Sequence, residues 1–357
     1  MTTITIMAGG TGGHVIPALA VADELAKRGV EVSWIGTEQG LESTLVRRAG
    51  IDFDAIKVKG VRGSGLKRKL ILPWMLLTSM LQSAKIFRLR KPKAVLGMGG
   101  FVSGPGGLVA VLLGIPLVLH EQNTVAGLTN SWLGKMSKRV FSGFPQAIGL
   151  NQFVWVGNPV RDEIANLATP KLRLADRSGP LRILVIGGSQ GASIFNECIP
   201  VALGRHEPQL FTVRHQCGKG NEQAVVARYD EASVHGEVSE FIDDMAQAYA
   251  WSDVVIGRAG AMTVSEICAA GVAALFVPYP YAVNDHQRKN AQYLSEHGGA
   301  CLVDQADFSS GDGWVETLID FKNNRGRLIE MATCARTLAK TDATLKVSTY
   351  CLEVAGA

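Results

Sequence analysis

Residues 4–13 read Ile-Thr-Ile-Met-Ala-Gly-Gly-Thr-Gly-Gly, a short apolar run that ends in a turn rich in glycine. An alternating apolar pattern follows as far as Leu25, which is typical of an amphipathic helix. The order strand, glycine turn and helix is the opening unit of a Rossmann-like domain. This stretch therefore predicts a parallel sheet with helices on both faces.

The same plan returns about half a chain length later. Residues 183–191 read Ile-Leu-Val-Ile-Gly-Gly-Ser-Gln-Gly, and a second helical pattern covers 192–203. Further short apolar runs lie at 30–35, 94–98, 117–120, 154–156, 211–215, 254–256 and 274–278. Such runs alternating with helical patterns predict parallel strands that are covered on both sides. The fold class is therefore α/β, with two Rossmann-like, doubly wound domains.

Composition limits the class of protein. A chain of 357 residues is long enough for two domains, and 47% hydrophobic with 19% charged residues excludes a disordered chain. The six cysteines are widely spaced, so neither a zinc site nor a disulfide framework is indicated. The first residues lack the pattern of a signal peptide, and we expect a cytoplasmic protein.

Charge is unevenly distributed along the chain. Residues 1–160 hold 18 Lys and Arg against 8 Asp and Glu, whereas residues 161–357 hold 18 against 24. Eleven of the basic residues fall between Lys57 and Lys93, and no acid occurs between Ala55 and His120. A stretch of this length without acids predicts an anionic partner.

Within the basic stretch, residues 70–81 form a run of 12 mostly apolar residues, which is too short to span a bilayer. Basic flanks and a tryptophan favour a helix lying on an anionic membrane surface, with a buried helix as the alternative. The residues expected at that surface are Lys67, Arg68, Lys69, Leu70, Trp74 and Leu77.

Glycine turns that lead into helices are candidate phosphate sites, because the N–H groups at a helix N-terminus attract anions. The chain has such turns at 9–13, 97–107 and 187–191, and together they predict a phosphorylated ligand. A dinucleotide-binding dehydrogenase is the alternative, with Glu38 as the ribose-binding acid. The Gly-x-Gly-x-x-Gly motif of such enzymes needs a small third residue, but that position is Val15 here, which disfavours the dehydrogenase.

His14 follows the first glycine turn at the beginning of a helix, where we expect a neutral imidazole that can accept a proton.

Two acidic motifs could hold a metal ion. Asp52-Phe53-Asp54 is better explained as a strand edge, and Asp243-Asp244 as a helix cap. We expect neither a required metal nor another cofactor.

Together, these motifs resemble the MurG family of peptidoglycan glycosyltransferases. That family moves N-acetylglucosamine (GlcNAc) from UDP-GlcNAc to the 4-hydroxyl of N-acetylmuramic acid (MurNAc) in lipid I, an undecaprenyl-pyrophosphoryl-MurNAc-pentapeptide, and so forms lipid II. The stretches that carry the resemblance are 9–14, 97–107, 120–123, 157–161, 187–192, 241–245, 258–266 and 285–290.

The resemblance implies a GT-B fold, in which two Rossmann-like domains face each other across a cleft. Residues 1–160 would bind acceptor and membrane, together with a C-terminal helix at about 342–357 that packs back onto them. Residues 161–341 would bind UDP-GlcNAc.

The resemblance also implies roles for individual residues. The Ile242 backbone would meet uracil, Glu266 the ribose, and the helix that opens at 261–265 the pyrophosphate. Gln287 and Asn290 would hold sugar hydroxyls. The full set of implied substrate-binding residues is Thr11, Gly12, Gly13, Asn123, Arg161, Ser189, Gly191, Ile242, Ala261, Met262, Thr263, Val264, Ser265, Glu266, Gln287 and Asn290.

The reaction implied is an inverting displacement, with His14 as the base and Glu121 as the alternative. Helix N-termini and Arg161 would stabilise the leaving UDP. The expected partners are UDP-GlcNAc, lipid I, an anionic membrane surface and cell-wall synthesis proteins, without nucleic acid. The expected location is the cytoplasmic face of the cell membrane. A UDP-GlcNAc 2-epimerase and a non-catalytic membrane adaptor remain alternatives.

Overall fold

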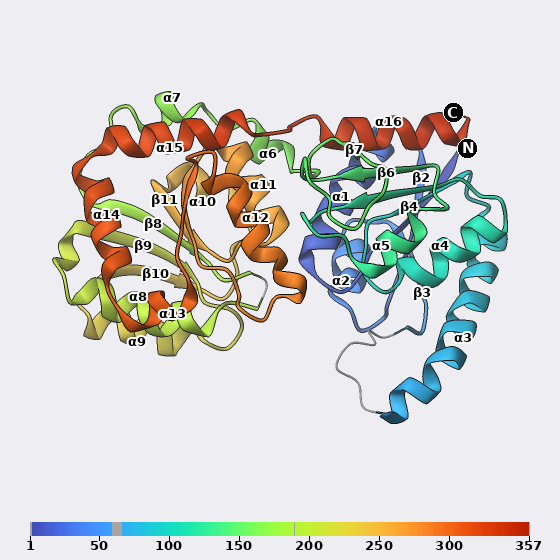
Figure 1. The fold of residues 1–357 in the computed structure, drawn as a ribbon, viewed down its shortest axis with the longest axis horizontal. Helices are drawn as coiled ribbons and strands as arrows, with labels where there is room; N and C mark the ends of the chain where they lie inside the picture. Colours follow the sequence, from blue (N-terminus) through green and yellow to red (C-terminus); the bar gives the residue numbers. More distant parts are fainter. Residues whose placement is uncertain (1, 59–65, 189, 357) are drawn as a thin grey trace. The chain divides into compact units, whose positions relative to one another are not determined.

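The computed structural model describes residues 2–58, 66–188 and 190–356, without the side chains of 66–71. The chain forms two compact units (Figure 1). Unit 1 comprises Met1–Val160 and Lys340–Ala357, and unit 2 comprises Arg161–Ala339. The C-terminal segment thus belongs to the same unit as the N-terminal half of the chain.

Unit 1 is built on a parallel sheet in the order β3-β2-β1-β4-β5-β6-β7. This order reverses between β1 and β4, as in doubly wound folds. The strands are β1 (Thr3–Met7), β2 (Glu31–Gly36), β3 (Asp52–Ala55), β4 (Ala94–Gly97), β5 (Leu117–Glu121), β6 (Arg139–Ser142) and β7 (Val154–Trp155).

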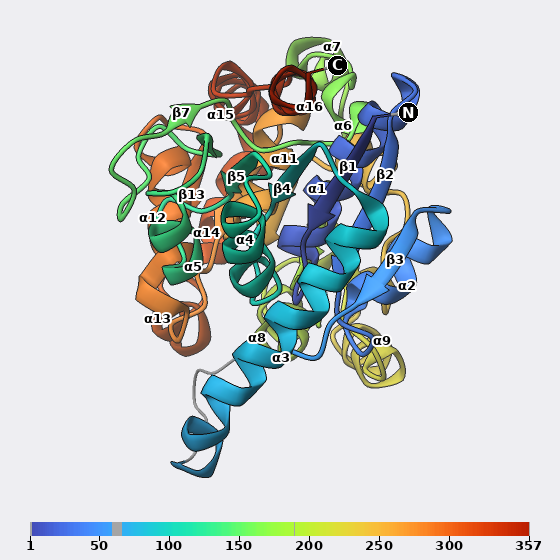
Figure 2. The same ribbon diagram turned by 90° about the vertical axis from the view of Figure 1, so that its right-hand side faces the viewer.

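Helices cover both faces of this sheet. One apolar core joins β1 to α1 (Gly12–Lys27), α2 (Leu41–Arg48) and the C-terminal α16 (Ala343–Ala355). A second core, on the other face, joins the sheet to α3 (Leu66–Arg90), α4 (Ser103–Leu112) and α5 (Leu128–Leu133). Figure 2 shows α3 and α4 side by side.

Unit 2 repeats the plan with a parallel sheet in the order β10-β9-β8-β11-β12-β13. Its strands are β8 (Leu181–Ile186), β9 (Phe211–Gln216), β10 (His235–Ser239), β11 (Val254–Gly257), β12 (Ala273–Phe276) and β13 (Ala300–Leu302). Its helices are α6 (Asp162–Ala165), α7 (Pro170–Leu174), α8 (Ser193–Gly204), α9 (Glu222–Glu231), α10 (Met245–Trp251), α11 (Ala261–Ala270), α12 (His286–Ser295), α13 (Gln305–Ser310), α14 (Gly313–Asn323) and α15 (Arg325–Thr337).

The prediction of two Rossmann-like domains is confirmed, since each sheet is parallel and has the doubly wound order. The strands predicted from apolar runs are present, with ends shifted by one or two residues. The sequence patterns missed β6, β10 and β13, which are short or lie near a sheet edge.

Candidate functional site

The glycine turns lie where ligands bind in open parallel sheets. Ligands bind at the carboxyl ends of the strands, next to the point where strand order reverses. In unit 1 this point lies between β1 and β4, and in unit 2 between β8 and β11. The predicted glycine turns follow β1, β4 and β8, and the stretch 258–266, which carries the family resemblance, follows β11. The structure therefore brings the predicted residues together at one edge of each sheet.

In unit 1, the two glycine turns interlock around His14. Gly99 has φ +100°, and a methyl group there would lie 2.7 Å from His14 Cδ2 and 2.9 Å from its Nε2. Gly100 has φ +82°, and a methyl group there would overlap the carbonyl oxygen of Gly9. These glycines are required because an imidazole and a backbone segment occupy the space of a side chain. The turns after β1 and β4 thus form one site.

His14 is the third residue of α1, and Thr11 is the N-cap of that helix. The His14 backbone N–H donates to the Thr11 carbonyl at 3.0 Å, and Thr11 Oγ1 lies 3.4 Å from His14 Nδ1. The imidazole is half-buried. This arrangement places the His14 imidazole beside Thr11, Gly12 and Gly13, and its role as a base stays a prediction.

Glu121, the alternative base, is buried at the end of β5. Its Oε1 accepts from the Asn123 backbone N–H at 3.0 Å and from Asn123 Nδ2 at 3.3 Å. Its Oε2 accepts from Gly127 N at 3.1 Å and from Asn130 Nδ2 at 2.8 Å. Both oxygens hold the loop that follows the strand. Glu121 therefore holds the loop that contains Asn123, and the base role of either His14 or Glu121 stays a prediction.

His120, which precedes Glu121, connects two motifs that are far apart in the sequence. Its imidazole is fully buried, and Nε2 lies 2.9 Å from the Gly157 carbonyl oxygen. Burial lowers the pKa of His120 to about 4, against the opposing effect of the Gly157 hydrogen bond, so the ring is neutral at pH 7. Asn158 Nδ2 also donates to the Gln122 carbonyl at 3.0 Å. The segments 120–123 and 157–161 therefore support each other.

In unit 2, the turn after β8 packs against the segment after β9. A methyl group at Gly191 would overlap the Cys217 carbonyl, and one at Gly218 would overlap the Gln190 carbonyl. Both glycines have positive φ, as does Gly188, which has no atom within 4 Å of the position of a side chain. Open space beside a glycine backbone is suited to a phosphate. Ser189, also predicted here, lies outside the described residues.

Glu266 on α11 lies close to two partners. Arg161 donates to Oε1 at 3.3 Å, and the Tyr249 hydroxyl donates to Oε2 at 3.1 Å. Burial raises the pKa of the Glu266 carboxyl, although Arg161 and the Tyr249 hydroxyl act in the opposite direction. The structure thus joins two predicted residues, Arg161 and Glu266. It adds Tyr249, a buried residue of α10 that belongs to none of the predicted motifs.

The remaining residues that are predicted to bind UDP-GlcNAc occupy different environments. Ala261, Met262 and Val264 are buried in the first turns of α11, where Thr263 and Ser265 are half-buried, as is Ile242 before α10. Gln287 Oε1 accepts from the Tyr279 N–H at 2.9 Å. Asn290 is fully buried, and its Nδ2 donates to the Ala259 carbonyl at 3.2 Å. In this structure Asn290 supports the segment before α11, and its contact with a sugar stays a prediction.

The two acidic motifs that could have held a metal ion form an ion pair and a helix cap instead. Arg90 Nε donates to Asp54 at 2.8 Å and its Nη1 pairs with Asp52 on β3. Asp244 accepts from the Gln247 N–H at 2.8 Å as the N-cap of α10, which confirms the predicted cap. Across 2–58, 66–188 and 190–356, no three His, Cys, Asp or Glu side chains are placed to hold a metal ion together.

Glu38, the acid that a dehydrogenase would need, is held elsewhere. Its two oxygens accept from Arg47 Nη1 and Nη2 at 2.9 Å each on an exposed surface. The pairing gives Glu38 a structural partner on α2, which is sufficient to explain this acidic residue.

The predicted interfacial segment lies in α3. Trp74, Leu77 and Leu81 are 68%, 47% and 63% exposed, so the alternative of a buried helix is wrong for these side chains. The side chains of Lys67, Arg68, Lys69 and Leu70 lie outside the described residues. None of the helices, over the residues that the structure describes, has the length and apolar character needed to cross a membrane.

The apolar exposure continues beyond α3. Helix α4 packs against both α3 and α5. Leu112 on α4 and Leu128 and Trp132 on α5 are more than half exposed. No motif marks these residues: Leu112 lies in an apolar run that reads as part of the core, and Leu128 and Trp132 stand among small and polar residues.

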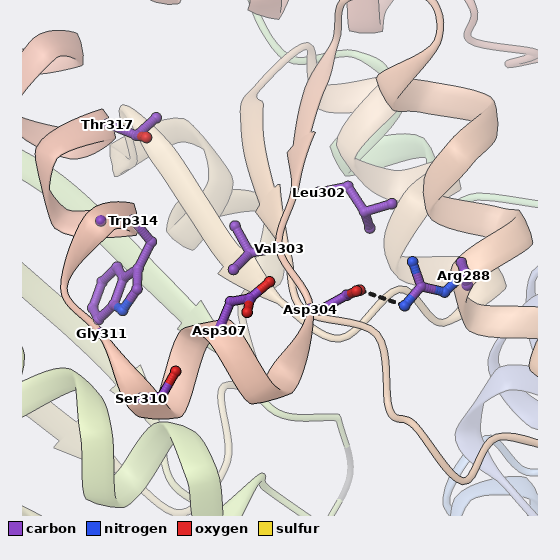
Figure 3. A pocket seen from close by; sticks show the side chains of 10 residues that line it. Arg288, Leu302, Val303, Asp304, Asp307, Ser310, Gly311, Trp314 and Thr317 are labelled. Carbon is purple, nitrogen blue, oxygen red and sulfur yellow. Dashed lines mark hydrogen bonds and ion pairs between the residues drawn. The ribbon is translucent and has the colours of Figure 1, made fainter.

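A cavity of about 580 Å³ lies in unit 2 beside β13, α13 and α14 (Figure 3). Asp304 and Asp307 line it, and Asp304 forms an ion pair with Arg288. The lining also includes Trp314. None of the predicted substrate residues is among those that line this cavity.

The sequence and structure match known proteins over almost the whole chain. Residues 4–142 match the glycosyltransferase family 28 N-terminal domain, and residues 182–347 match its C-terminal domain. The chain is 48% identical over 355 residues to the UDP-N-acetylglucosamine--N-acetylmuramyl-(pentapeptide) pyrophosphoryl-undecaprenol N-acetylglucosamine transferase of Alcanivorax borkumensis, covering 99% of this chain and 98% of that protein. The protein of the same name from Marinobacter nauticus is 48% identical over 353 residues, covering 98% and 97%.

A solved structure gives the same result. The crystal structure of Acinetobacter baumannii MurG superposes with a TM-score of 0.85 at 40% identity, covering 99% of this chain and 100% of that one. These matches cover both halves of the chain. The chain is a glycosyltransferase that belongs to family 28 and, within it, to the MurG family.

Proposed function

We propose that this chain transfers GlcNAc from UDP-GlcNAc to the 4-hydroxyl of MurNAc in undecaprenyl-pyrophosphoryl-MurNAc-pentapeptide. The observation that carries the proposal is His14, held by interlocked glycine turns at the strand-order reversal of unit 1. The names of the enzymes that are 48% identical supply both substrates.

In the proposed reaction, the MurNAc hydroxyl oxygen attacks the anomeric carbon of GlcNAc. The bond from that carbon to the phosphate oxygen breaks, and UDP leaves with the bonding electrons. His14 takes the hydroxyl proton, so the attacking oxygen does not carry a positive charge as the new bond forms. Attack from the face opposite the phosphate inverts the anomeric centre and gives a β-1,4 linkage.

Unit 2 would bind the donor. The first N–H groups of α11 have no partner within their own helix, and they would face the pyrophosphate. Arg161 is one-third exposed beside Glu266, so its guanidinium can act both on that carboxylate and on the charge of leaving UDP. Glu266 would accept from the ribose hydroxyls.

Ligand specificity is the first test. We expect UDP-GlcNAc to raise the melting temperature and NAD to leave it unchanged, because a ligand that binds only the folded state stabilises it. Glu266→Ala should reduce the shift with UDP-GlcNAc, since the ribose loses a charged acceptor. Differential scanning fluorimetry measures both effects. Stabilisation by NAD alone would contradict the transferase proposal.

Metal dependence is the second test. We expect transfer to continue in excess EDTA, because backbone N–H groups and Arg161 would stabilise the pyrophosphate charge. The ion pair of Asp52 and Asp54 with Arg90 supports this expectation. Loss of transfer in EDTA, with recovery on adding Mg²⁺ or Mn²⁺, would contradict it.

Membrane association is the third test. We propose that the exposed apolar side chains of α3, with the adjacent basic residues, dock on an anionic membrane where the lipid acceptor resides. Trp74 and Leu77 would insert, and each nearby Lys or Arg would contribute about 1 kcal/mol. We expect sedimentation with anionic vesicles that weakens as salt is added, because salt screens the charges.

Substitution should separate docking from chemistry. Trp74→Ser with Leu77→Ser, or Glu at Lys67, Arg68 and Lys69, should reduce vesicle binding and activity on a long-chain acceptor. A short-chain acceptor should still react, because it needs no membrane encounter. Leu172→Ser in unit 2 removes an apolar side chain that is also exposed, and it is the control. Parent-level vesicle binding by both α3 variants would show that this face is not the docking surface.

A further inference from the structure

Glu42 on α2 is a buried carboxylate that lies outside the sequence motifs. It is 0% exposed. Its Oε1 accepts from the Thr37 N–H at 2.9 Å and from Thr37 Oγ1 at 2.7 Å, and its Oε2 accepts from the Gly10 N–H at 3.2 Å. A buried carboxylate loses its hydrogen bonds to water, and burial is costly unless protein donors replace them. One side chain thus joins the end of β2 to the glycine turn after β1.

Three glycines leave space for this side chain. A methyl group at Gly9 would lie 2.7 Å from Glu42 Oε1, and one at Gly36 would lie 2.7 Å from Glu42 Cγ. A methyl group at Gly40 would overlap the carboxylate itself. Two segments therefore meet at Glu42, the glycine turn after β1 and the connection from β2 to α2, and its side chain fills the space between them.

The turn that Glu42 supports leads to His14. Gly10 has φ +97° and precedes Thr11, the N-cap of α1. Gly9 lies between Glu42 on one side and Gly100 on the other. A shift of Gly9 or Gly10 would move the beginning of α1, and the imidazole with it.

We propose that Glu42 is a positioning residue, whose carboxylate holds the first glycine turn so that His14 meets the acceptor hydroxyl. The inference rests on the proposed transferase function. Glu42 itself contacts neither substrate in this assignment. A displacement of about 1 Å at a reacting group can cost about 100-fold in rate, so a small change in the turn is sufficient to lower turnover.

Glu42→Gln tests the proposal with little change in shape. One of the two oxygens becomes an NH₂ group, which faces either the Gly10 N–H or the donors of Thr37. We expect kcat to fall by about 10–100-fold, while KM for UDP-GlcNAc stays within about threefold, because the donor residues lie in unit 2. Hydrogen–deuterium exchange of peptides covering 8–16 should become faster, since the turn has lost an anchor.

Two controls separate positioning from general stability. Thr37→Val removes only the hydroxyl donor and keeps the bond to Gly10, so kcat should stay within about threefold of the parent. Asp253→Asn alters another buried carboxylate, which pairs with Arg177 at 2.8 Å in unit 2. It should lower the melting temperature and leave kcat unchanged at temperatures where the protein is folded.

The outcomes are distinct. Parent-level kcat with parent-level exchange at 8–16 in Glu42→Gln would overturn the proposal, as would equal losses of kcat in Glu42→Gln and Asp253→Asn. If Glu42→Gln does not fold, Glu42→Asp keeps the charge and withdraws it by one methylene, and parent-level kcat there would also overturn it. A parent protein without transfer activity would refute the proposed function instead, and the exchange measurement would still report whether Glu42 anchors the turn.

Discussion

His14→Ala is expected to lower turnover by about 10²–10⁴, the usual effect of removing a general base, while UDP-GlcNAc affinity changes by a few-fold at most. The reason is geometric. The imidazole is fixed at the beginning of α1 by Thr11 and lies against Gly99, whereas the predicted donor residues Arg161 and Glu266 belong to unit 2. Steady-state kinetics with varied donor, on a short-chain acceptor, measures both quantities.

His235→Ala is the matched control, because His235 is exposed at the beginning of β10 and should not affect turnover. Unchanged turnover in His14→Ala would remove the base role from this residue. The base role would then pass to Glu121, the alternative candidate, or to another group.

Gly99→Ala is expected to lower turnover by about 100-fold and to destabilise the fold. A residue other than glycine at φ +100° costs about 1–3 kcal/mol, and the added methyl group would lie 2.7 Å from the His14 ring. The imidazole must move to make room, and misplacement of a reacting group is costly. Kinetics and thermal unfolding of the same preparation measure the two effects.

Gly29→Ala separates strain from displacement. Gly29 has φ +76° at the end of α1, and no atom lies within 4 Å of an added methyl group. This variant should lose only the stability that an alanine at positive φ costs, and it should keep its turnover. If Gly99→Ala and Gly29→Ala behaved alike, the contact of Gly99 with His14 would have no role in the reaction.

The sequence was sufficient for the fold because the repeated pattern is local. A strand, a glycine turn and a helix lie within about 25 residues in each half, and their apolar periods differ. Strands β6, β10 and β13 were missed because they are short and lie towards the edges of their sheets. Their partner strands define them more than their own sequence does.

Helix α7 is another element that local sequence does not reveal. Residues 169–180 include four charged residues and no long apolar run, yet Pro170–Leu174 are helical. A helix of five residues is not stable alone. Arg173 holds it in place by donating to the Ser252 carbonyl at 2.9 Å and to the Gly271 carbonyl. Those acceptors come from segments about 80 and 98 residues later, which no local pattern reveals.

The candidate site was predicted as separate motifs, and its internal contacts were not. His14 and the glycine turns have recognisable patterns, but the fit of Gly99 to the His14 ring requires two strands to be neighbours. Glu42 and Tyr249 have no pattern, because each acts through a contact with a residue from another element. Sequence motifs thus identify the groups that meet ligands better than the groups that hold them.

The most direct test incubates the parent protein with radiolabelled UDP-GlcNAc and a short-chain lipid-linked MurNAc-pentapeptide. The proposal predicts a lipid-linked GlcNAc-β-1,4-MurNAc product, formed with release of UDP and dependent on both substrates. A UDP-GlcNAc 2-epimerase would instead convert the donor sugar without an acceptor. Conversion of the donor without label in the lipid-linked product, or no reaction of a folded protein that binds UDP-GlcNAc, would contradict the proposed transfer.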